Sequence, residues 1–343
     1  MTKTILSPLG FSAGLTKNVT SSVATYFSVS SLRKSLVAFA AISMLLGCNE
    51  KKEQDHKKAP EVVSLLGITY YEPERSEALQ HRLDSNLQVA VANFERDPSE
   101  ENYIWYGRRL GYMSKFNEAI EVLSEGIEKY PESYKLLRHR GHRYVSMRLF
   151  DRAIDDFNRA AQLMTPYPPE IEPDGAPNRL NIPLSNTQFN IWYHLGLAHY
   201  LKGDFDKAEQ AYIECLKASD NDDLLVATID WFYMTYKRQG KDEVAEGLLG
   251  NISDSLKIIE NDSYYKRLKM YQGKLQPEDL LQVDPSANDY DLSLATQGYG
   301  VGNWYLYNGD TAKAVEIFEK VTSGKSFSSF GFIAAEAELA RMK

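Results

Sequence analysis

The sequence is poor in cysteine and has no excess of basic residues, and both shortages narrow the possible functions. The 343 residues include only two cysteines, Cys48 and Cys215, which excludes a disulfide scaffold and a cysteine-rich zinc module. The formal net charge of −8 argues against a nucleic-acid-binding surface, which usually needs a basic stripe. With 43% hydrophobic and 25% charged residues, the chain has the composition of a globular protein.

The short motifs that mark common catalytic sites are also missing. The sequence contains no G-x-x-x-x-G-K-[ST] phosphate loop, no G-x-S-x-G elbow and no H-E-x-x-H metal motif. Its six histidines do not combine with other ligands at a recognisable metal-binding spacing. We therefore predict a protein that is not an enzyme and that needs neither a metal nor a cofactor.

The N-terminal stretch differs in composition from the rest of the chain. Residues 1–47 contain no acidic residue, and the basic pair Arg33-Lys34 precedes an apolar run over residues 36–46. This run is shorter than the roughly 20 residues of a membrane-spanning helix, but it has the length of a signal-peptide apolar region. It ends in Leu-Leu-Gly-Cys48, which resembles the lipobox of bacterial lipoproteins.

That resemblance implies a localisation. Residues 1–47 would be a cleaved signal peptide, and residues 48–60 would be the lipidated Cys48 followed by a polar, flexible tether. Asn49 stands where an aspartate would, by the sorting rule of Gram-negative lipoproteins, hold the protein in the inner membrane. We expect attachment to the bacterial outer membrane through the lipid alone, with the protein facing the periplasm.

The remainder of the chain repeats itself. The same apolar, small and aromatic columns recur after 34 residues and again after a further 55, with weaker copies around Ile229 and Val301. The columns hold, in turn, Tyr106, Gly107 and Leu110, then Arg140, Gly141 and Tyr144, then Leu195, Gly196 and His199. This pattern resembles the tetratricopeptide repeat (TPR), in which two antiparallel helices pack through small residues that face large ones.

The repeats predict an all-α, TPR-type helical solenoid of about five helix pairs with capping helices. The expected parts are an N-terminal capping region (61–99), copies one and two (100–164), a proline-rich insertion (165–185), copies three and four (186–260), an irregular helical segment (261–295), and copy five with a C-terminal capping helix (296–343). The chain resembles bacterial single-chain TPR proteins and, more loosely, outer-membrane adaptor lipoproteins. The resemblance implies a fold and no reaction.

The insertion contains six prolines, which exclude a helix and favour an extended loop. Insertions in solenoids often lie on the binding side, so this loop is either a lid or partner contact, or an ordered crossover between two halves.

Three arginines, Arg109, Arg140 and Arg143, fall in columns that usually pack against neighbouring helices. A buried arginine needs an acidic partner or a ligand. Two interpretations stay open. Carboxylates such as Asp151, Asp155 or Glu121 pair with these guanidinium groups, or the arginines form a recessed anion site.

The TPR resemblance also implies which residues face the concave wall. Basic residues come first, and aromatic and amide residues follow, a combination that suits an extended peptide or the C-terminal segment of a protein. The implied wall residues are Arg108, Lys135, Arg138, His142, Asn190, Tyr193, Tyr200, Asp230, Tyr299 and Asn303.

Two functions follow from these patterns. The first is a lipid-anchored adaptor that binds a protein partner in its concave groove and binds no nucleic acid. The alternative is a protein that binds a small anionic ligand, or an atypical enzyme. Its arginine and histidine cluster would lie beside Asp222, Asp223 and Asp230 under the proline-rich loop.

Overall fold

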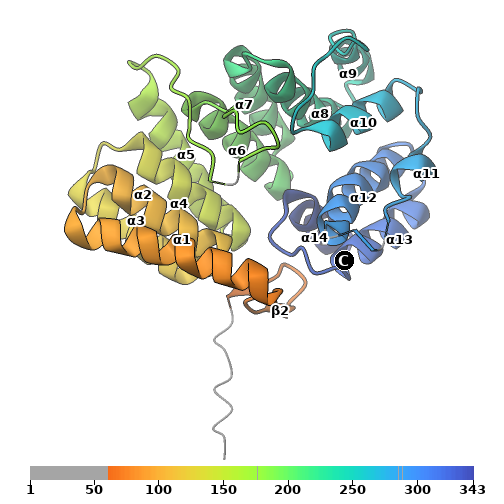
Figure 1. The fold of residues 1–343 in the computed structure, drawn as a ribbon. Coiled ribbons are helices and arrows are strands. Elements are labelled where there is room, and N and C mark those ends of the chain that lie inside the picture. The colour runs from red at the N-terminus through yellow and green to blue at the C-terminus, as the bar shows by residue number, and fades with distance from the viewer. Residues whose placement is uncertain (1–60, 176, 285, 288) are drawn as a thin grey trace, which may run out of the picture. The chain divides into compact units, whose positions relative to one another are not determined.

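The computed structural model describes residues 61–343 except 176, 285 and 288 (Figure 1). The chain divides into two units, Met1–Asp55 and His56–Lys343, and all described residues lie in the second. The predicted signal peptide, the lipidated Cys48 and the tether therefore lie outside the described residues. No helix in the described part of the chain is long and apolar enough to cross a membrane.

Within the described residues, ten helices form five consecutive antiparallel pairs, as the repeats predict. The pairs are α2 (Glu100–Tyr112) with α3 (Phe116–Lys129), α4 (Tyr134–Ser146) with α5 (Phe150–Met164), α6 (Thr187–Lys202) with α7 (Phe205–Ala218), α8 (Asp222–Arg238) with α9 (Asp242–Leu249), and α12 (Tyr290–Tyr307) with α13 (Thr311–Thr322). The fold class is an all-α, TPR-type solenoid.

The glycine column explains how closely the helices of a pair approach each other. A Cβ atom added at Gly141 would lie 2.8 Å from the Phe157 ring, and one added at Gly196 would lie 2.8 Å from the Tyr212 ring. Each glycine thus leaves room for a large side chain of the second helix in its pair. In the fourth pair Tyr233 occupies this column, and its hydroxyl group donates a hydrogen bond to Glu246 at 3.1 Å.

Further helices lie before, within and after the array. Helix α1 (Glu77–Arg96) precedes the first pair and ends just before Pro98, and α14 (Phe330–Arg341) follows the last pair. The segment predicted to be irregular, residues 261–295, holds α10 (Asp262–Tyr271) and the single turn α11 (Pro277–Leu280).

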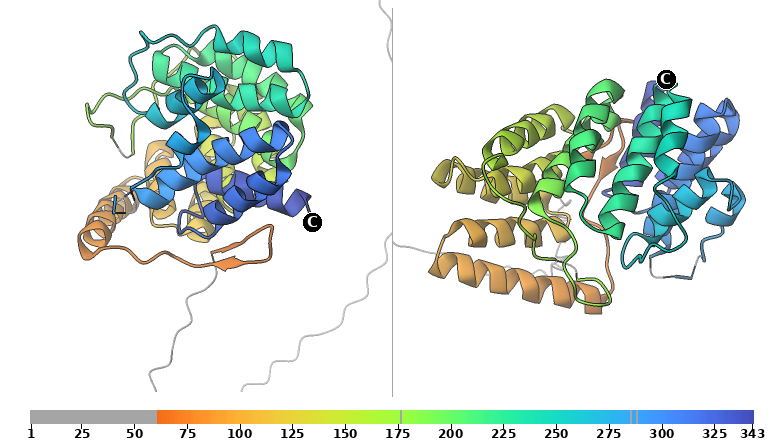
Figure 2. Two further views of the ribbon diagram at one scale, coloured as in Figure 1. Left: turned by 90° about the vertical axis from the view of Figure 1, so that its right-hand side faces the viewer. Right: turned by 90° about the horizontal axis from the view of Figure 1, so that it is seen from above.

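A short hairpin that no sequence pattern predicts precedes α1. Strands β1 (Val62–Val63) and β2 (Thr69–Tyr70) pair antiparallel, with Val62 opposite Tyr70. The hairpin runs alongside α14, because the backbone N–H of Leu65 donates to Glu336 at 2.7 Å (Figure 2). The Tyr70 ring also stacks on Phe327, with 4.9 Å between ring centroids. The two ends of the described chain therefore contact each other.

Helix α14 also closes back onto the earlier repeats. Arg148, in the turn between α4 and α5, forms a buried ion pair with Glu336, with 2.8 Å between Nη2 and Oε2. Arg341 donates to the carbonyl oxygen of Leu201 at the end of α6 at 2.8 Å. The C-terminal helix therefore caps the last pair and also covers part of the inner surface of the array.

Candidate functional site

The structure divides the predicted concave wall into a part buried in the core and a part in which Arg108, Lys135 and His142 remain partly exposed. Six of the ten predicted residues are at most 6% exposed, so the expected open aromatic wall is wrong for this part of the array. These six are Asn190, Tyr193, Tyr200, Asp230, Tyr299 and Asn303. Their surroundings belong to the core rather than to a binding surface.

Contacts among the later helices explain this burial. The Tyr299 hydroxyl donates to the Tyr200 hydroxyl at 2.7 Å, and burial raises the pKa of both phenols. Asp230 pairs with Arg267 of α10, and both side chains are fully buried. Asn303 accepts a hydrogen bond from Arg238 at 3.2 Å. The inward columns of α6, α8 and α12 therefore hold the array together.

The remaining predicted wall residues form a basic surface at the N-terminal end. Arg108 is on α2, and Lys135, Arg138 and His142 are on α4. Lys135 and Arg138 are three residues apart and thus lie on neighbouring positions of one helix face. We call Arg108, Arg109, Lys135 and Arg138 the basic wall.

The proline-rich insertion runs across this wall as an extended strand. Ile171 pairs with Asn186 in an isolated antiparallel bridge. The backbone N–H of Glu172 donates to the carbonyl oxygen of Ser185 at 2.9 Å, and the backbone N–H of Thr187 donates to the carbonyl oxygen of Glu170 at 2.8 Å. Alternate residues of an extended strand point to opposite sides, and Ile171 is 64% exposed. We call residues 170–174 the acidic strand.

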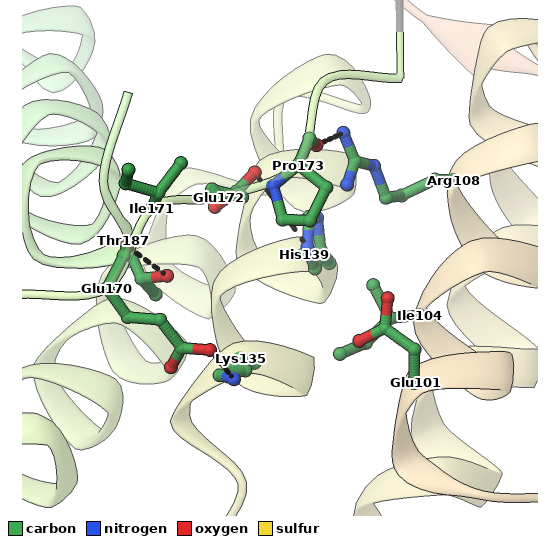
Figure 3. A pocket seen from close by; sticks show the side chains of 10 residues that line it. All are labelled: Glu101, Ile104, Arg108, Lys135, His139, Glu170, Ile171, Glu172, Pro173 and Thr187. Atoms are coloured by element: carbon green, nitrogen blue, oxygen red, sulfur yellow. Dashed lines mark hydrogen bonds and ion pairs between the residues drawn. The ribbon is translucent and has the colours of Figure 1, made fainter. Parts of the chain in front are cut away.

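The acidic strand binds the basic wall through side chains and backbone (Figure 3). Lys135 Nζ lies 2.7 Å from Glu170 Oε1, and Arg138 Nη2 lies 3.0 Å from Glu172 Oε1. Arg108 donates to the carbonyl oxygen of Pro173 at 2.8 Å. Arg109 donates to the carbonyl oxygen of Gly175 at 3.0 Å. The predicted peptide-binding wall is thus occupied by an extended segment of the chain itself.

A recess of about 80 Å³ remains between wall and strand. Its lining includes Ile104, Arg108, His139 and Glu172. A recess of this volume has room for a few water molecules, because each water needs roughly 10–15 Å³. A second polypeptide does not fit beside the acidic strand in this arrangement.

The packed arginines have different surroundings. Arg140 forms a bidentate pair with Asp156, at 2.8 and 2.7 Å, and also donates to Ser124. This confirms the structural interpretation for Arg140, with Asp156 in place of the three expected carboxylates. Arg109 lies over the Trp105 ring, with 4.9 Å from its guanidinium carbon to the ring centroid, and burial lowers its pKa.

Arg143, like Arg109, has no described carboxylate within ion-pair distance, and it donates a hydrogen bond to a histidine. Its Nη2 lies 2.8 Å from His142 Nδ1. Its guanidinium group lies against Gly111, where an added Cβ would come within 2.2 Å of Nη1. Burial lowers the pKa of Arg143 to about 10.

Three histidines fill the space behind the wall. The ring centroids of His142 and His194 are 4.6 Å apart, and His139 Nδ1 accepts a hydrogen bond from Arg138 at 3.0 Å. Burial, together with the nearby Arg138 and Arg143, holds the pKa of His194 at about 3. Burial also holds the pKa values of the other two far below the ordinary range. The cluster is therefore neutral at pH 7.

The aspartates that the small-ligand alternative placed beside this cluster are engaged elsewhere. Asp223 accepts hydrogen bonds from the backbone N–H groups of Ile259, Glu260 and Asn261. Asp230 pairs with Arg267. Among the described residues, no group of three or more His, Cys, Asp or Glu side chains is arranged to hold a metal ion.

The repeat columns predict the wall residues but not the segment that covers them. The proline content of the insertion predicts a lid, a partner contact or a crossover, and does not distinguish between them. A further feature of the insertion is an acid at every second position, Glu170, Glu172 and Asp174. This alternation, next to prolines that prevent a helix, is the sequence feature that indicates an extended acidic segment facing the basic wall.

Comparisons with known proteins agree on the repeat. Residues 189–222 match the family described as Tetratricopeptide repeat, and these residues correspond to α6 and α7. The proteins named BBSome complex member BBS4 from Bos taurus and Mus musculus are 24% and 23% identical over 163 residues. The match covers 46% of this chain and 27% of each relative, so the chain spans about a quarter of their length.

Solved structures show similar helix pairs at low identity. YrrB, a TPR protein whose structure is described as having an unusual peptide-binding site, is 14% identical, with a TM-score of 0.39. The match covers 74% of this chain and 99% of YrrB. A tetratricopeptide repeat protein from Parabacteroides merdae is 16% identical, with coverage of 76% and 94% and a TM-score of 0.44.

Proposed function

We propose that this chain is a non-enzymatic interaction adaptor, anchored in the bacterial envelope through lipid on Cys48, that binds an extended segment of a protein partner on the basic wall. One observation carries the proposal: the wall already holds an extended polypeptide. Arg108 and Arg109 donate to carbonyl oxygens of that segment, which are contacts that any peptide offers. Lys135 and Arg138 meet its carboxylates.

The location of the wall supports this role. It lies on the first helices of the first two pairs, away from the inner columns that α14 and α10 cover. The partner would approach α2 and α4 from the side now taken by the acidic strand. Peptide contact there leaves the buried ion pairs of the later repeats intact.

Site-specific photo-crosslinking tests this function. A photoreactive residue replaces Glu101, which is exposed and lines the recess beside the wall, in the anchored chain. The control places the same residue at Val244, an exposed position on α9 in the fourth pair. We expect a crosslinked protein from position 101 that is absent from position 244. We also expect it to disappear in the double variant Arg108→Glu, Lys135→Glu. Identical products from both positions would contradict the proposal, as would a product that survives charge reversal.

A second candidate, a small-anion site, is favoured by Arg143, whose guanidinium group meets a neutral histidine and no described carboxylate. Calorimetric titration with inorganic phosphate tests it, with Arg143→Met as the matched variant. Heat of binding that Arg143→Met abolishes would support the anion site. Equal curves for the two proteins would reject it.

A further inference from the structure

The acidic strand meets the wall in a regular way. Glu170, Glu172 and Asp174 occupy alternate positions, which an extended chain directs to one side. Glu170 pairs with Lys135, and Glu172 pairs with Arg138. Asp174 follows Pro173, whose carbonyl oxygen accepts from Arg108 at 2.8 Å, but it forms no ion pair with a described residue. Two carboxylates thus pair with two cations of one helix face, and the third comes next in the same alternation.

A simple connection between two helix pairs does not require these contacts. Three residues, 219–221, join α7 to α8, and four residues, 130–133, join α3 to α4. The insertion between α5 and α6 is much longer, and its outward residues Ile171 and Pro173 are exposed. Its inward side chains therefore bind the wall, as the side chains of a bound ligand would.

The acidic strand is nevertheless an incomplete ligand for this wall. Arg138 keeps a buried Nε with no hydrogen-bond partner, and Asp174 keeps a buried Oδ2 with none. The basic wall has four cations against the three carboxylates of the strand. Glu101, at the rim, accepts from the Trp105 indole at 2.6 Å. A peptide with better placed or additional carboxylates can therefore bind hydrogen-bond donors of the wall that the strand leaves unused.

The strand is also held in a way that permits exchange. The side chains of Glu170 and Lys135 are 51% and 28% exposed, and ion pairs with this exposure contribute little to stability. Glu172 is the anchor, because it is buried and also accepts from Asn190 at 3.1 Å. On the opposite side, the two backbone hydrogen bonds around Ile171 join the strand to residues 185–187, and Gln188 accepts from the Glu170 N–H at 3.2 Å.

We infer that the acidic strand is a built-in competitor for the basic wall, and that the partner segment is an extended acidic peptide with carboxylates at alternate positions. The inference rests on the function proposed above and specifies the chemistry of its partner. Because the strand is tethered, its effective concentration at the wall is high, in the millimolar range for a short connection. A partner peptide must displace the tethered strand. The affinity of the wild-type protein for such a peptide is therefore lower than the affinity of a wall from which the strand is absent.

The test uses a fluorescent synthetic copy of residues 169–175, Pro-Glu-Ile-Glu-Pro-Asp-Gly, and fluorescence anisotropy. The key protein is a variant with Glu170→Gln, Glu172→Gln and Asp174→Asn, which keeps side-chain shape and removes charge. We expect this variant to bind the peptide at least tenfold more tightly than wild type. In the same background, Arg108→Ala with Lys135→Ala should abolish binding. A wall that binds the peptide no more tightly after neutralisation overturns the inference.

Two control peptides separate alternation from net charge. The first replaces the three acids by their amides and should not bind. The second has the same composition with its acids consecutive, Pro-Glu-Glu-Asp-Ile-Pro-Gly, and should bind clearly more weakly than the copy. Equal binding of the copy and the consecutive peptide would show attraction by charge alone and reject the alternating partner motif.

Circular dichroism checks that the protein variants are folded. If the triple variant is unfolded, the Glu170→Gln, Asp174→Asn double variant retains the buried Glu172 and carries the same expectation in smaller degree.

Failure of this inference can be told apart from failure of the proposed function. If the crosslinked partner at position 101 forms equally in wild type and in the neutralised variant, and an excess of the peptide does not compete, the inference fails and the adaptor function stands. If no partner crosslinks but the neutralised variant binds the peptide more tightly, the adaptor function fails and the internal competition stands.

Discussion

The contrast between Arg140 and Arg143 shows how one residue type serves two purposes on a single helix. The two lie three residues apart on α4, yet Arg140 is paired with Asp156 and Arg143 meets a histidine. Removing one partner of a buried pair leaves the other charge uncompensated, whereas removing an unpaired cation does not.

This contrast predicts effects of different size on stability. Arg140→Met should lower the free energy of unfolding by about 3 kcal/mol, because Asp156 stays buried without its partner. Arg143→Met should change it by less than about 1 kcal/mol or raise it, since the substitution removes an unpaired buried charge. Urea unfolding followed by circular dichroism measures both. Equal losses in the two variants would contradict the assigned pairing.

The buried histidines predict sensitivity to acid. Unfolded histidine takes up a proton near pH 6.5, but His194 in the folded protein does so only near pH 3. The unfolded state therefore binds more protons across this window, and stability falls as the pH decreases from 6.5 towards 3. At pH 4.5 His194 alone should cost about 2–3 kcal/mol.

The matched variant His194→Gln isolates this contribution. Carboxylates also titrate at low pH, but they do so in both proteins. The decrease in the urea midpoint between pH 7 and pH 4.5 should be larger for wild type than for His194→Gln. Parallel pH profiles would show that His194 does not carry a depressed pKa.

At the scale of elements, the repeat columns predict the helix pairs well because their cause is local. A glycine at 141 or 196 and a large ring 16 residues later form a contact inside one pair, and this contact recurs along the chain. The hairpin and the return of α14 depend instead on single long-range contacts, such as Arg148 with Glu336, which no period contains.

The same limit applies to the candidate site. The columns placed Lys135 and Arg138 on one basic face of α4, because helix period alone decides that. They also assigned Tyr200 and Tyr299 to an open wall, because they carry no information on how far the array curves. The hydrogen bond between these two residues, 99 positions apart, depends on that curvature.

The closing contact of α14 can be broken selectively. Glu336→Ala leaves Arg148 buried without a carboxylate and removes the acceptor of the Leu65 N–H, and should cost about 3–5 kcal/mol. Hydrogen exchange should accelerate most in α14 and the hairpin, while α2 and α3 remain nearly as protected as in wild type. Glu319→Ala, an exposed position on α13, serves as the control. Uniform acceleration over all helices would indicate a cooperative unit rather than a separable closure.

At the scale of the whole molecule, the proposed adaptor depends on where the wall is held. The acidic strand and its competitors act over a few ångströms, but lipidation at Cys48 would restrict the protein to a membrane surface and concentrate it with partners there. A lipid anchor and a groove with weak individual contacts complement each other, because confinement raises the effective concentration of both components.

The anchor and its sorting signal make separate predictions that two substitutions distinguish. Cys48→Ser should abolish incorporation of radiolabelled palmitate and prevent signal cleavage at residue 48. Asn49→Asp should keep the label but move the protein from outer-membrane to inner-membrane fractions in a sucrose gradient, as the resemblance to Gram-negative lipoproteins implies. A Cys48→Ser protein that still takes up label would exclude this anchor. Unchanged fractionation of Asn49→Asp would leave the anchor intact but remove the argument for the outer membrane.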